Sequence, residues 1–175
     1  MEFPILTPRT RLRRLTPADL PDFQRYRHDT EVGRYQSWLP QSDAEATAFL
    51  AASATAEFFE PGVWFQIGMA DLETDRLIGD IGICLAVALP EAEIGFTVCR
   101  ESQGRGLGRE AVAAMVAFIF CETCVNRIVA NTDARNSASI NLLEKLGMQR
   151  LHTSEALFRG LPCEEHLYAL DRPVA

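Results

Sequence analysis

A glycine-rich segment at residues 103–108, Gln-Gly-Arg-Gly-Leu-Gly, constrains this chain more than any other part of its sequence. It follows an apolar strand pattern and leads into a long apolar helix pattern, which places it at a strand-to-helix turn. Glycines let a backbone approach a ligand closely, and the free N–H groups at a helix start bind phosphate. Arg100, Arg105 and Arg109 add positive charge around the glycines. The segment therefore predicts a phosphate site.

The other hydrophobic patterns predict one mixed α/β (α+β) domain over residues 1–175. One early helix opens at Thr16-Pro17, and a second opens at the capping box Ser42–Glu45 and runs to about Phe59. Further helices are expected at 107–124 and 137–146. Strands are expected at 9–15, 63–70, 77–84, 92–98, 126–132, 149–157 and 165–170. This order predicts a central sheet with helices on both faces.

Charge is distributed unevenly in this chain, whose formal net charge is −7. Residues 35–98 contain ten acidic residues and one basic residue, and no basic run occurs, so we do not expect a nucleic-acid binder. The acidic stretch indicates a cationic partner, with a solvated acidic face as the alternative. No membrane partner is expected, because the longest apolar run, 111–121, is too short to span a bilayer and no signal peptide pattern precedes it.

The five cysteines (84, 99, 121, 124 and 163) are odd in number and lack the spacing of a disulfide framework. Cys121 and Cys124 form a C-x-x-C pair, but no second pair or nearby histidine completes a zinc site, so no metal is expected. We expect structural thiols in a reducing, cytoplasmic compartment.

Two common phosphate loops do not explain the glycines. Residues 106–111 fit the dinucleotide pattern G-x-G-x-x-A, but too few residues follow Asp133 to complete a doubly wound sheet. A Walker loop is excluded because no Gly-Lys-Ser/Thr sequence occurs.

The segment 103–108 instead resembles the Q/R-x-x-G-x-G/A signature of the GNAT N-acetyltransferases. Residues 136–148 resemble the second coenzyme-contacting segment of that superfamily, N-x-x-S-x-x-x-L-E-K-L-G-F, with Met148 in place of the usual phenylalanine. The opening residues 6–13 and the closing residues 166–170 are similar to the RimJ/RimL branch. The resemblance implies the GNAT fold, with a mixed, mostly antiparallel sheet of six to seven strands.

The resemblance also implies acetyl-CoA as co-substrate. Loop amides would bind its pyrophosphate, strand N–H groups would face the pantetheine and the acetyl carbonyl, and the start of the helix at 137–146 would contact the pantetheine arm. The residues expected to do so are Thr97, Val98, Cys99, Gln103, Gly104, Arg105, Gly106, Leu107, Gly108, Arg109, Asn136 and Ser139. Asn136 is equally natural as a helix N-cap.

Acetyl transfer to an amine requires proton acceptance and protection of the leaving thiolate. Glu93 is the candidate base, because its strand would place it beside the thioester, although it could be a plain solvated strand residue. Many GNAT enzymes protonate the thiolate with a tyrosine seven residues after the asparagine, where this chain has Leu143. Ser139 is the remaining catalytic candidate near the sulfur, with a structural role as the alternative.

We therefore predict an N-acetyltransferase that transfers acetyl directly to a primary amine in a ternary complex. The acceptor is a protein N-terminus or a small cationic amine, and Tyr35, Trp38, Phe58 and Phe59 are candidate walls of its pocket. The alternative is a non-catalytic acyl-CoA-binding or regulatory domain of the same fold. The branch also makes a homodimer possible.

Overall fold

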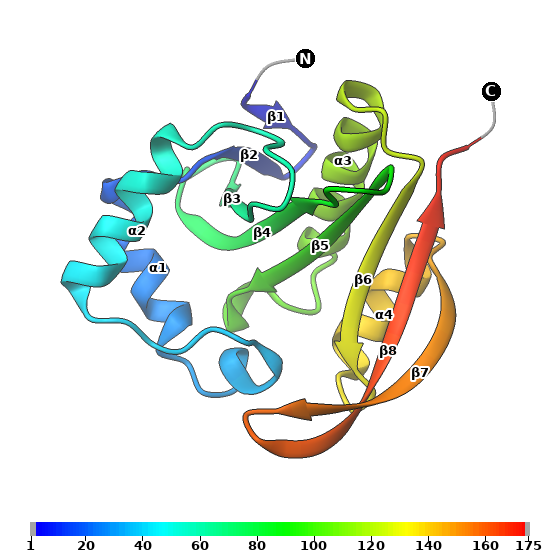
Figure 1. The fold of residues 1–175 in the computed structure, drawn as a ribbon. Coiled ribbons are helices and arrows are strands. Elements are labelled where there is room, and N and C mark those ends of the chain that lie inside the picture. The colour runs from blue at the N-terminus through cyan, green and yellow to red at the C-terminus, as the bar shows by residue number, and fades with distance from the viewer. Residues whose placement is uncertain (1–2, 174–175) are drawn as a thin grey trace.

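The computed structural model describes residues 3–173 and shows a mixed eight-stranded sheet (Figure 1). The strands lie in the order β1-β2-β3-β4-β5-β6-β8-β7, and all neighbours are antiparallel except β5 and β6. Their bounds are β1 (Ile5–Leu6), β2 (Thr10–Arg14), β3 (Phe65–Asp71), β4 (Leu77–Leu85), β5 (Glu91–Val98), β6 (Arg127–Asp133), β7 (Gln149–Phe158) and β8 (Leu161–Asp171). The expected mostly antiparallel sheet is present, with more strands than the six to seven predicted.

The additional strand is β1, whose two residues pair with Leu12 and Arg11 of β2. So short a strand carries no alternating pattern, which is why the sequence did not indicate it. The second helix also ends earlier than predicted, at Thr55, because Ala56 adopts an extended conformation. Phe58 and Phe59 then pack outside the helix against Phe65.

Four α-helices cover the two faces of the sheet. They are α1 (Leu20–Arg27), α2 (Asp43–Thr55), α3 (Leu107–Glu122) and α4 (Ser137–Lys145), with short 3₁₀ turns η1 (Pro17–Asp19), η2 (Val32–Tyr35) and η3 (Arg100–Ser102). Helices α1 and α2 pack together and against β3 and β4, whereas α3 and α4 lie on the opposite face (Figure 1). In β5-α3-β6 and β6-α4-β7 a helix joins parallel strands, and the right-handed connection that such units adopt places α3 and α4 on the same face.

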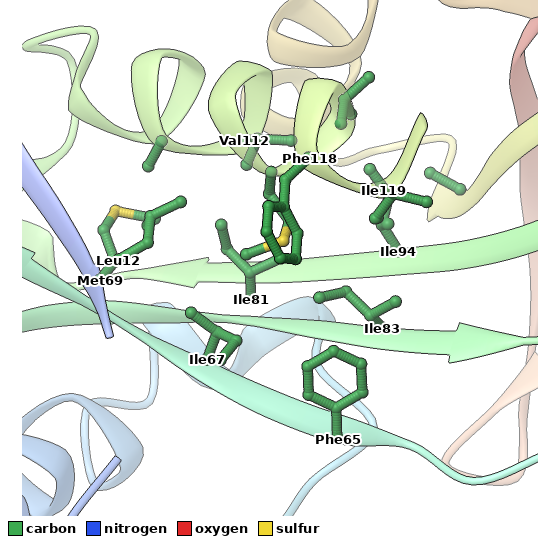
Figure 2. Packing of buried hydrophobic residues seen from close by; sticks show 14 of the residues in the cluster. Leu12, Phe65, Ile67, Met69, Ile81, Ile83, Ile94, Val112, Phe118 and Ile119 are labelled. Atoms are coloured by element: carbon green, nitrogen blue, oxygen red, sulfur yellow. The ribbon is translucent and has the colours of Figure 1, made fainter. Parts of the chain in front are cut away.

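Alternation along the central strands divides their side chains between the two helical layers. Ile81 and Ile83 of β4 point toward Val112 and Ile119 of α3 in the main core (Figure 2). The alternate residues Asp80 and Gly82 face the other layer, where they line a cavity together with Phe23 of α1 and Phe49 of α2. The second face therefore receives the polar and small residues from which a site can be built.

Candidate active site

The sheet opens between β5 and β6. Among the described residues these strands pair at three positions only, from Glu91 opposite Arg127 to Glu93 opposite Val129. Beyond Glu93, β5 continues beside β4 and β6 continues beside β8, so the two strands separate toward their C-terminal ends (Figure 1). We call this parting of β5 and β6 the seam. It leaves the outer backbone edge of β5 without a strand partner in the described part of the chain.

Two glutamines mark the backbone groups of β5 that face the seam. Gln36 Nε2 donates to Phe96 O at 3.3 Å, and Gln103 Nε2 donates to Val98 O at 2.9 Å. Because successive residues of a strand direct their N–H and C=O groups to opposite edges, the N–H groups of Phe96 and Val98 face the same way as these carbonyls.

The three N–H donors expected on this strand consequently differ. Cys99 N–H donates to Ile78 O of β4 at 2.8 Å, so it is already engaged. Thr97 O points toward β4 so closely that a Cβ atom on Gly79 would overlap it. Of the three, Val98 is the residue whose amide faces the seam. Val98 is therefore the one of these three residues whose N–H can donate to a ligand in the seam.

The glycine loop lies directly after β5 and leads into α3. Gly104 and Gly106 have φ angles of 71° and 78°, in the left-handed region where glycine is unstrained. Helix α3 begins at Leu107, as predicted, with Gly106 as its N-cap. The N–H groups of its first turn have no intrahelical acceptor, so those of Leu107, Gly108 and Arg109 are available to a ligand. This arrangement fits a pyrophosphate group.

Contacts from distant parts of the chain fix the loop. Arg9 Nη1 donates to Arg105 O at 3.0 Å, and the Arg9 guanidinium pairs with Glu110 at 2.7 Å. A Cβ atom on Gly108 would lie 3.0 Å from the Val98 side chain, so this glycine lets α3 pack closely on β5. No sequence pattern indicates this contribution of Arg9, because the residue lies about one hundred positions before the loop.

The arginines around the site are not equivalent. Arg100 binds Asp29 through two contacts of 2.5 and 2.8 Å, and Arg135 pairs with Asp133 at 2.6 Å. Arg105 and Arg109 are exposed and have no ion-pair partner within residues 3–173. These two are the arginines available to neutralise an anionic coenzyme.

Helix α4 follows β6, the second strand of the seam, and packs against it. Asn136 Oδ1 accepts from Ser139 N at 3.2 Å, so Asn136 is the N-cap of this helix, and its amide nitrogen is left for a second contact. Ser139 is half-buried one turn into the helix. Leu143 is fully buried in the core, so the position of the usual tyrosine offers no proton donor.

Glu93 lies at the last paired position of β5, where the seam begins. Its Oε1 accepts from Asn131 Nδ2 of β6 at 3.1 Å, a contact that bridges the two strands and that the sequence did not indicate. Across β4, Glu93 pairs in register with Cys84. Burial, and then the Glu93 charge, raise the pKa of the Cys84 thiol, so Cys84 is poorly suited to act as a nucleophile.

Two further titratable side chains, those of Tyr168 and His28, are engaged by other parts of the described structure. Tyr168 donates to Glu144 of α4 at 3.0 Å, and burial together with this hydrogen bond raises its pKa. His28 contacts Gln41 O at the end of α1. Neither residue contacts the exposed edge of β5.

A cavity of about 350 Å³ adjoins the same part of β5 on the α1 and α2 face. Gly95, Phe96 and Thr97 form part of its wall, so it reaches the backbone that also borders the seam. Its aromatic lining is Phe23, Trp38, Phe49 and Trp64. We call this space the acceptor cavity. A larger cavity of about 540 Å³ lies beside β2 and Phe3 and does not include β5.

Of the four predicted wall residues, Trp38 lines the acceptor cavity. Tyr35 lies beside Arg135, and its ring centre is 5.9 Å from that guanidinium. Phe58 and Phe59 belong instead to an aromatic cluster with Phe3 and Phe118. From the sequence alone, an aromatic residue near the end of α2 could line the acceptor cavity or belong to this aromatic cluster.

A buried charge cluster forms one side of the acceptor cavity. Arg27 Nη2 donates to Asp80 Oδ2 at 2.8 Å, and the Tyr26 hydroxyl donates to the same oxygen at 2.5 Å. Burial, followed by the Asp80 charge, places the pKa of Tyr26 well above its usual value. The guanidinium also stacks on Trp38 and Phe23, with ring-centre distances of 4.4 and 4.7 Å.

The described residues contain no group of three or more His, Cys, Asp or Glu side chains arranged to hold a metal ion. None of the helices formed by residues 3–173 combines the length and apolar character needed to cross a membrane.

Comparison with known proteins gives one consistent result. Residues 9–149 match the Acetyltransferase (GNAT) domain. The chain is 29% identical over 179 residues to YoaA of Bacillus subtilis, an uncharacterized N-acetyltransferase, covering 98% of each protein. A GNAT-family acetyltransferase structure from Bacillus anthracis superposes with a TM-score of 0.85 at 20% identity, covering 97% of this chain and 98% of that one.

A second structure is RimL, a ribosomal alpha-N-protein acetyltransferase in complex with coenzyme A. It superposes with a TM-score of 0.82 at 14% identity and covers 97% of this chain and 98% of its own. These matches agree with the glycine loop, the seam and the order of elements. The chain therefore belongs to the GNAT N-acetyltransferases, with relatives in the RimJ/RimL-like branch.

Proposed function

We propose that this enzyme transfers the acetyl group of acetyl-CoA directly to a primary amine in a ternary complex. The observation that carries the proposal is the meeting of two spaces at one strand. The seam borders β5 on its open edge, and the acceptor cavity reaches the same strand at Gly95–Thr97. A thioester in the seam and an amine in the cavity would therefore come together without a covalent enzyme intermediate.

The coenzyme side is assigned to backbone groups. The amides of the glycine loop and of the first turn of α3 would bind the pyrophosphate, with Arg105 and Arg109 as its cationic partners. The seam-facing amides of Phe96 and Val98 would hold the pantetheine and the acetyl carbonyl, and a donor aimed at the developing oxyanion stabilises it. The RimL structure with coenzyme A supports this use of the fold.

Transfer needs one proton removed and one thiolate released. The amine nitrogen attacks the thioester carbonyl, the C–N bond forms, the C–S bond breaks, and coenzyme A leaves as the thiolate. Glu93 receives the amine proton through a water, since its Cα lies two strand residues, or roughly 7 Å, from that of Gly95 on the same face of β5. Solvent or Ser139 supplies a proton to the thiolate, since Leu143 cannot.

The test is the pair Glu93→Gln and Glu91→Gln, which make the same change on the same face of one strand. We expect Glu93→Gln to lower kcat by about 100-fold, within the range typical of general base catalysis, with acetyl-CoA affinity unchanged. Glu91→Gln should leave both values unchanged. Calorimetry gives the affinity, and thiol release with a panel of primary amines gives the rate.

Each other result has a definite meaning. Equal losses of kcat and affinity in Glu93→Gln would remove Glu93 as the base. Binding of acetyl-CoA without thiol release on any amine would favour a non-catalytic coenzyme-binding domain, an alternative that the buried Leu143 supports. No binding of acetyl-CoA would contradict the assigned donor site.

A further inference from the structure

The interior of the acceptor cavity indicates what kind of amine it takes. We propose, on the basis of the proposed function, that the acceptor is a primary amine attached to an uncharged aromatic or branched apolar group, and not a polyamine. This choice rests on the charges inside the cavity, on its aromatic surfaces and on its rim. It departs from the cationic acceptor that the acidic middle of the sequence indicated.

Among the described residues that line the cavity, Asp80 is the one acidic side chain. It is 3% exposed, and its Oδ2 already accepts from Arg27 and Tyr26. The pair is neutral as a whole. A second cation entering the cavity would therefore find a carboxylate whose charge is compensated and would be placed near the positive Arg27.

Two aromatic rings of the cavity, like the Asp80 carboxylate, already contact Arg27. Faces of tryptophan and phenylalanine attract cations, and this would be the second means of holding a polyamine. Here the guanidinium of Arg27, a residue that is 7% exposed, stacks on both Trp38 and Phe23. The protein supplies its own cation to these rings, so the remaining surface favours an uncharged ligand.

Apart from Asp80, the acidic residues of the 35–98 stretch do not line the cavity. Asp71 accepts hydrogen bonds from Thr74 in the turn between β3 and β4, and Glu45 accepts from Ser42 at the start of α2. Neither lines the cavity. Their charges satisfy local turn and capping contacts, which is the solvated alternative that the sequence left open.

The remaining lining of the cavity carries no charge: small and apolar residues alternate with the uncharged polar side chains of Gln36, Ser37, Gln41, Gln66 and Thr97. Gly82 and Gly95 face each other across β4 and β5, and a Cβ atom on Gly95 would meet nothing within 4 Å. Leu39 and Trp64, which are 65% and 48% exposed, stand at the rim. A volume of about 350 Å³ matches a single ring with a short amine arm, near the lower limit of ligand pockets.

The test compares amines of similar reach. Thiol release from acetyl-CoA is measured with 2-phenylethylamine, 1,4-diaminobutane and spermidine, and with two short peptides that begin with phenylalanine or lysine. We expect kcat/KM to be at least about tenfold higher for the aromatic member of each set, the usual effect of filling an apolar pocket. Comparing the small amines with the peptides shows whether the apolar primary amine is a free small molecule or the N-terminus of a protein.

Two variants locate the effect. Gly95→Leu should abolish turnover of the aromatic amine while acetyl-CoA affinity stays unchanged, because its side chain enters the open part of the cavity. Trp64→Ala should raise KM for that amine about tenfold through lost apolar contact. Leu6→Ala, which removes an exposed apolar side chain on β1, is the matched control and should change neither value.

A second readout distinguishes failure of this inference from failure of the proposed function. The chain has two tryptophans, Trp38 and Trp64, and both line the cavity, so their fluorescence reports amine binding without turnover. Binding of 2-phenylethylamine in the presence of coenzyme A, with no thiol release on any amine, would overturn the transfer and retain the inference. Tighter binding or faster turnover of spermidine would overturn the inference and retain the transfer.

Discussion

The coenzyme side and the acceptor side of this protein are built from different materials. On the coenzyme side, the assigned groups are backbone amides and two arginines within one continuous stretch, from the end of β5 through the glycine loop to the first turn of α3. On the acceptor side, side chains converge from α1, α2, β3, β4 and the segment after η2. A backbone site needs particular glycines at particular positions, whereas a side-chain site depends on how distant elements pack.

The largest expected effect of breaking the acceptor side is on stability. Asp80→Asn leaves the buried Arg27 cation without its counter-ion, and we expect the free energy of unfolding to fall by about 3–5 kcal/mol. Urea denaturation measures this change. Asp171→Asn, which breaks the exposed pair with Arg127, should leave the denaturation midpoint unchanged. Equal effects of the two substitutions would mean that the Arg27 pair does not organise the cavity wall.

On the coenzyme side, the next largest effect is expected on acetyl-CoA affinity when one methyl group is added to the glycine loop. Gly106→Ala places a side chain at φ 78°, which costs about 1–2 kcal/mol, and we expect acetyl-CoA affinity to fall about fivefold to thirtyfold. Gly147→Ala carries the same strain at φ 84° after α4, so it should lower stability and leave affinity unchanged. Calorimetry and thermal unfolding of both variants separate the two contributions.

The charged contribution to coenzyme binding should be smaller and sensitive to salt. Arg105→Gln and Arg109→Gln each remove an exposed cation that has no ion-pair partner in the described part of the chain, and we expect Kd for acetyl-CoA to rise about threefold to tenfold at low salt. At 1 M salt the difference should vanish, because charges at the surface are then screened. Arg100→Gln is the control, since Asp29 holds that guanidinium. A larger effect of Arg100→Gln would reverse the assignment of the free arginines.

The smallest effect concerns the contacts of Glu110 with Thr7 and Arg9, which we call the clamp on the glycine loop. Burial would raise the pKa of Glu110, but hydrogen bonds from Thr7 and Arg9 outweigh it and hold this pKa below its usual 4.5. The carboxylate therefore adds stability above about pH 4.5 that is lost as the pH falls through the lower, folded-state pKa. Wild type should be more stable than Glu110→Gln at pH 7, and this difference should shrink as the pH falls below about 4.5.

Urea denaturation from pH 3 to pH 7 measures the difference between these two proteins. Glu155→Gln removes an exposed carboxylate of β7 and should give a difference that does not depend on pH in this way. A Glu110→Gln curve parallel to wild type at every pH would mean that the clamp does not stabilise the folded protein.

The contrast between a site built from backbone groups and a site built from converging side chains also explains which features could be predicted from the sequence. The glycine spacing placed the start of α3 at Leu107 and predicted the phosphate loop, because local backbone requirements appear directly as residue types. Asn136 was likewise recognisable as a cap. Arg27 could not be recognised, since a basic residue near the end of a helix is usually exposed, and its burial depends on Asp80 more than fifty residues later.

The direction of the backbone N–H groups along β5 could not be predicted from the sequence either. Thr97, Val98 and Cys99 are consecutive, and the sequence does not show which of their amides point away from β4. That depends on the register with β4 and on the point where β6 departs, and both are properties of the assembled sheet. The two-residue strand β1 was missed for a similar reason, because its pairing with β2 is its main signature.

The three-residue pairing of β5 with β6 has a thermodynamic consequence. The sheet is joined across this line by a few backbone hydrogen bonds, so a ligand that adds its own polar groups along the open edge completes the protein's secondary structure. Under the proposed binding mode, coenzyme occupancy and folding free energy become linked quantities, with a gain of about 2.7 kcal/mol when free ligand is at 100 times Kd. The thermal midpoint then reports the supply of acetyl donor, and amide exchange along the late part of β5 shows where that stabilisation enters the fold.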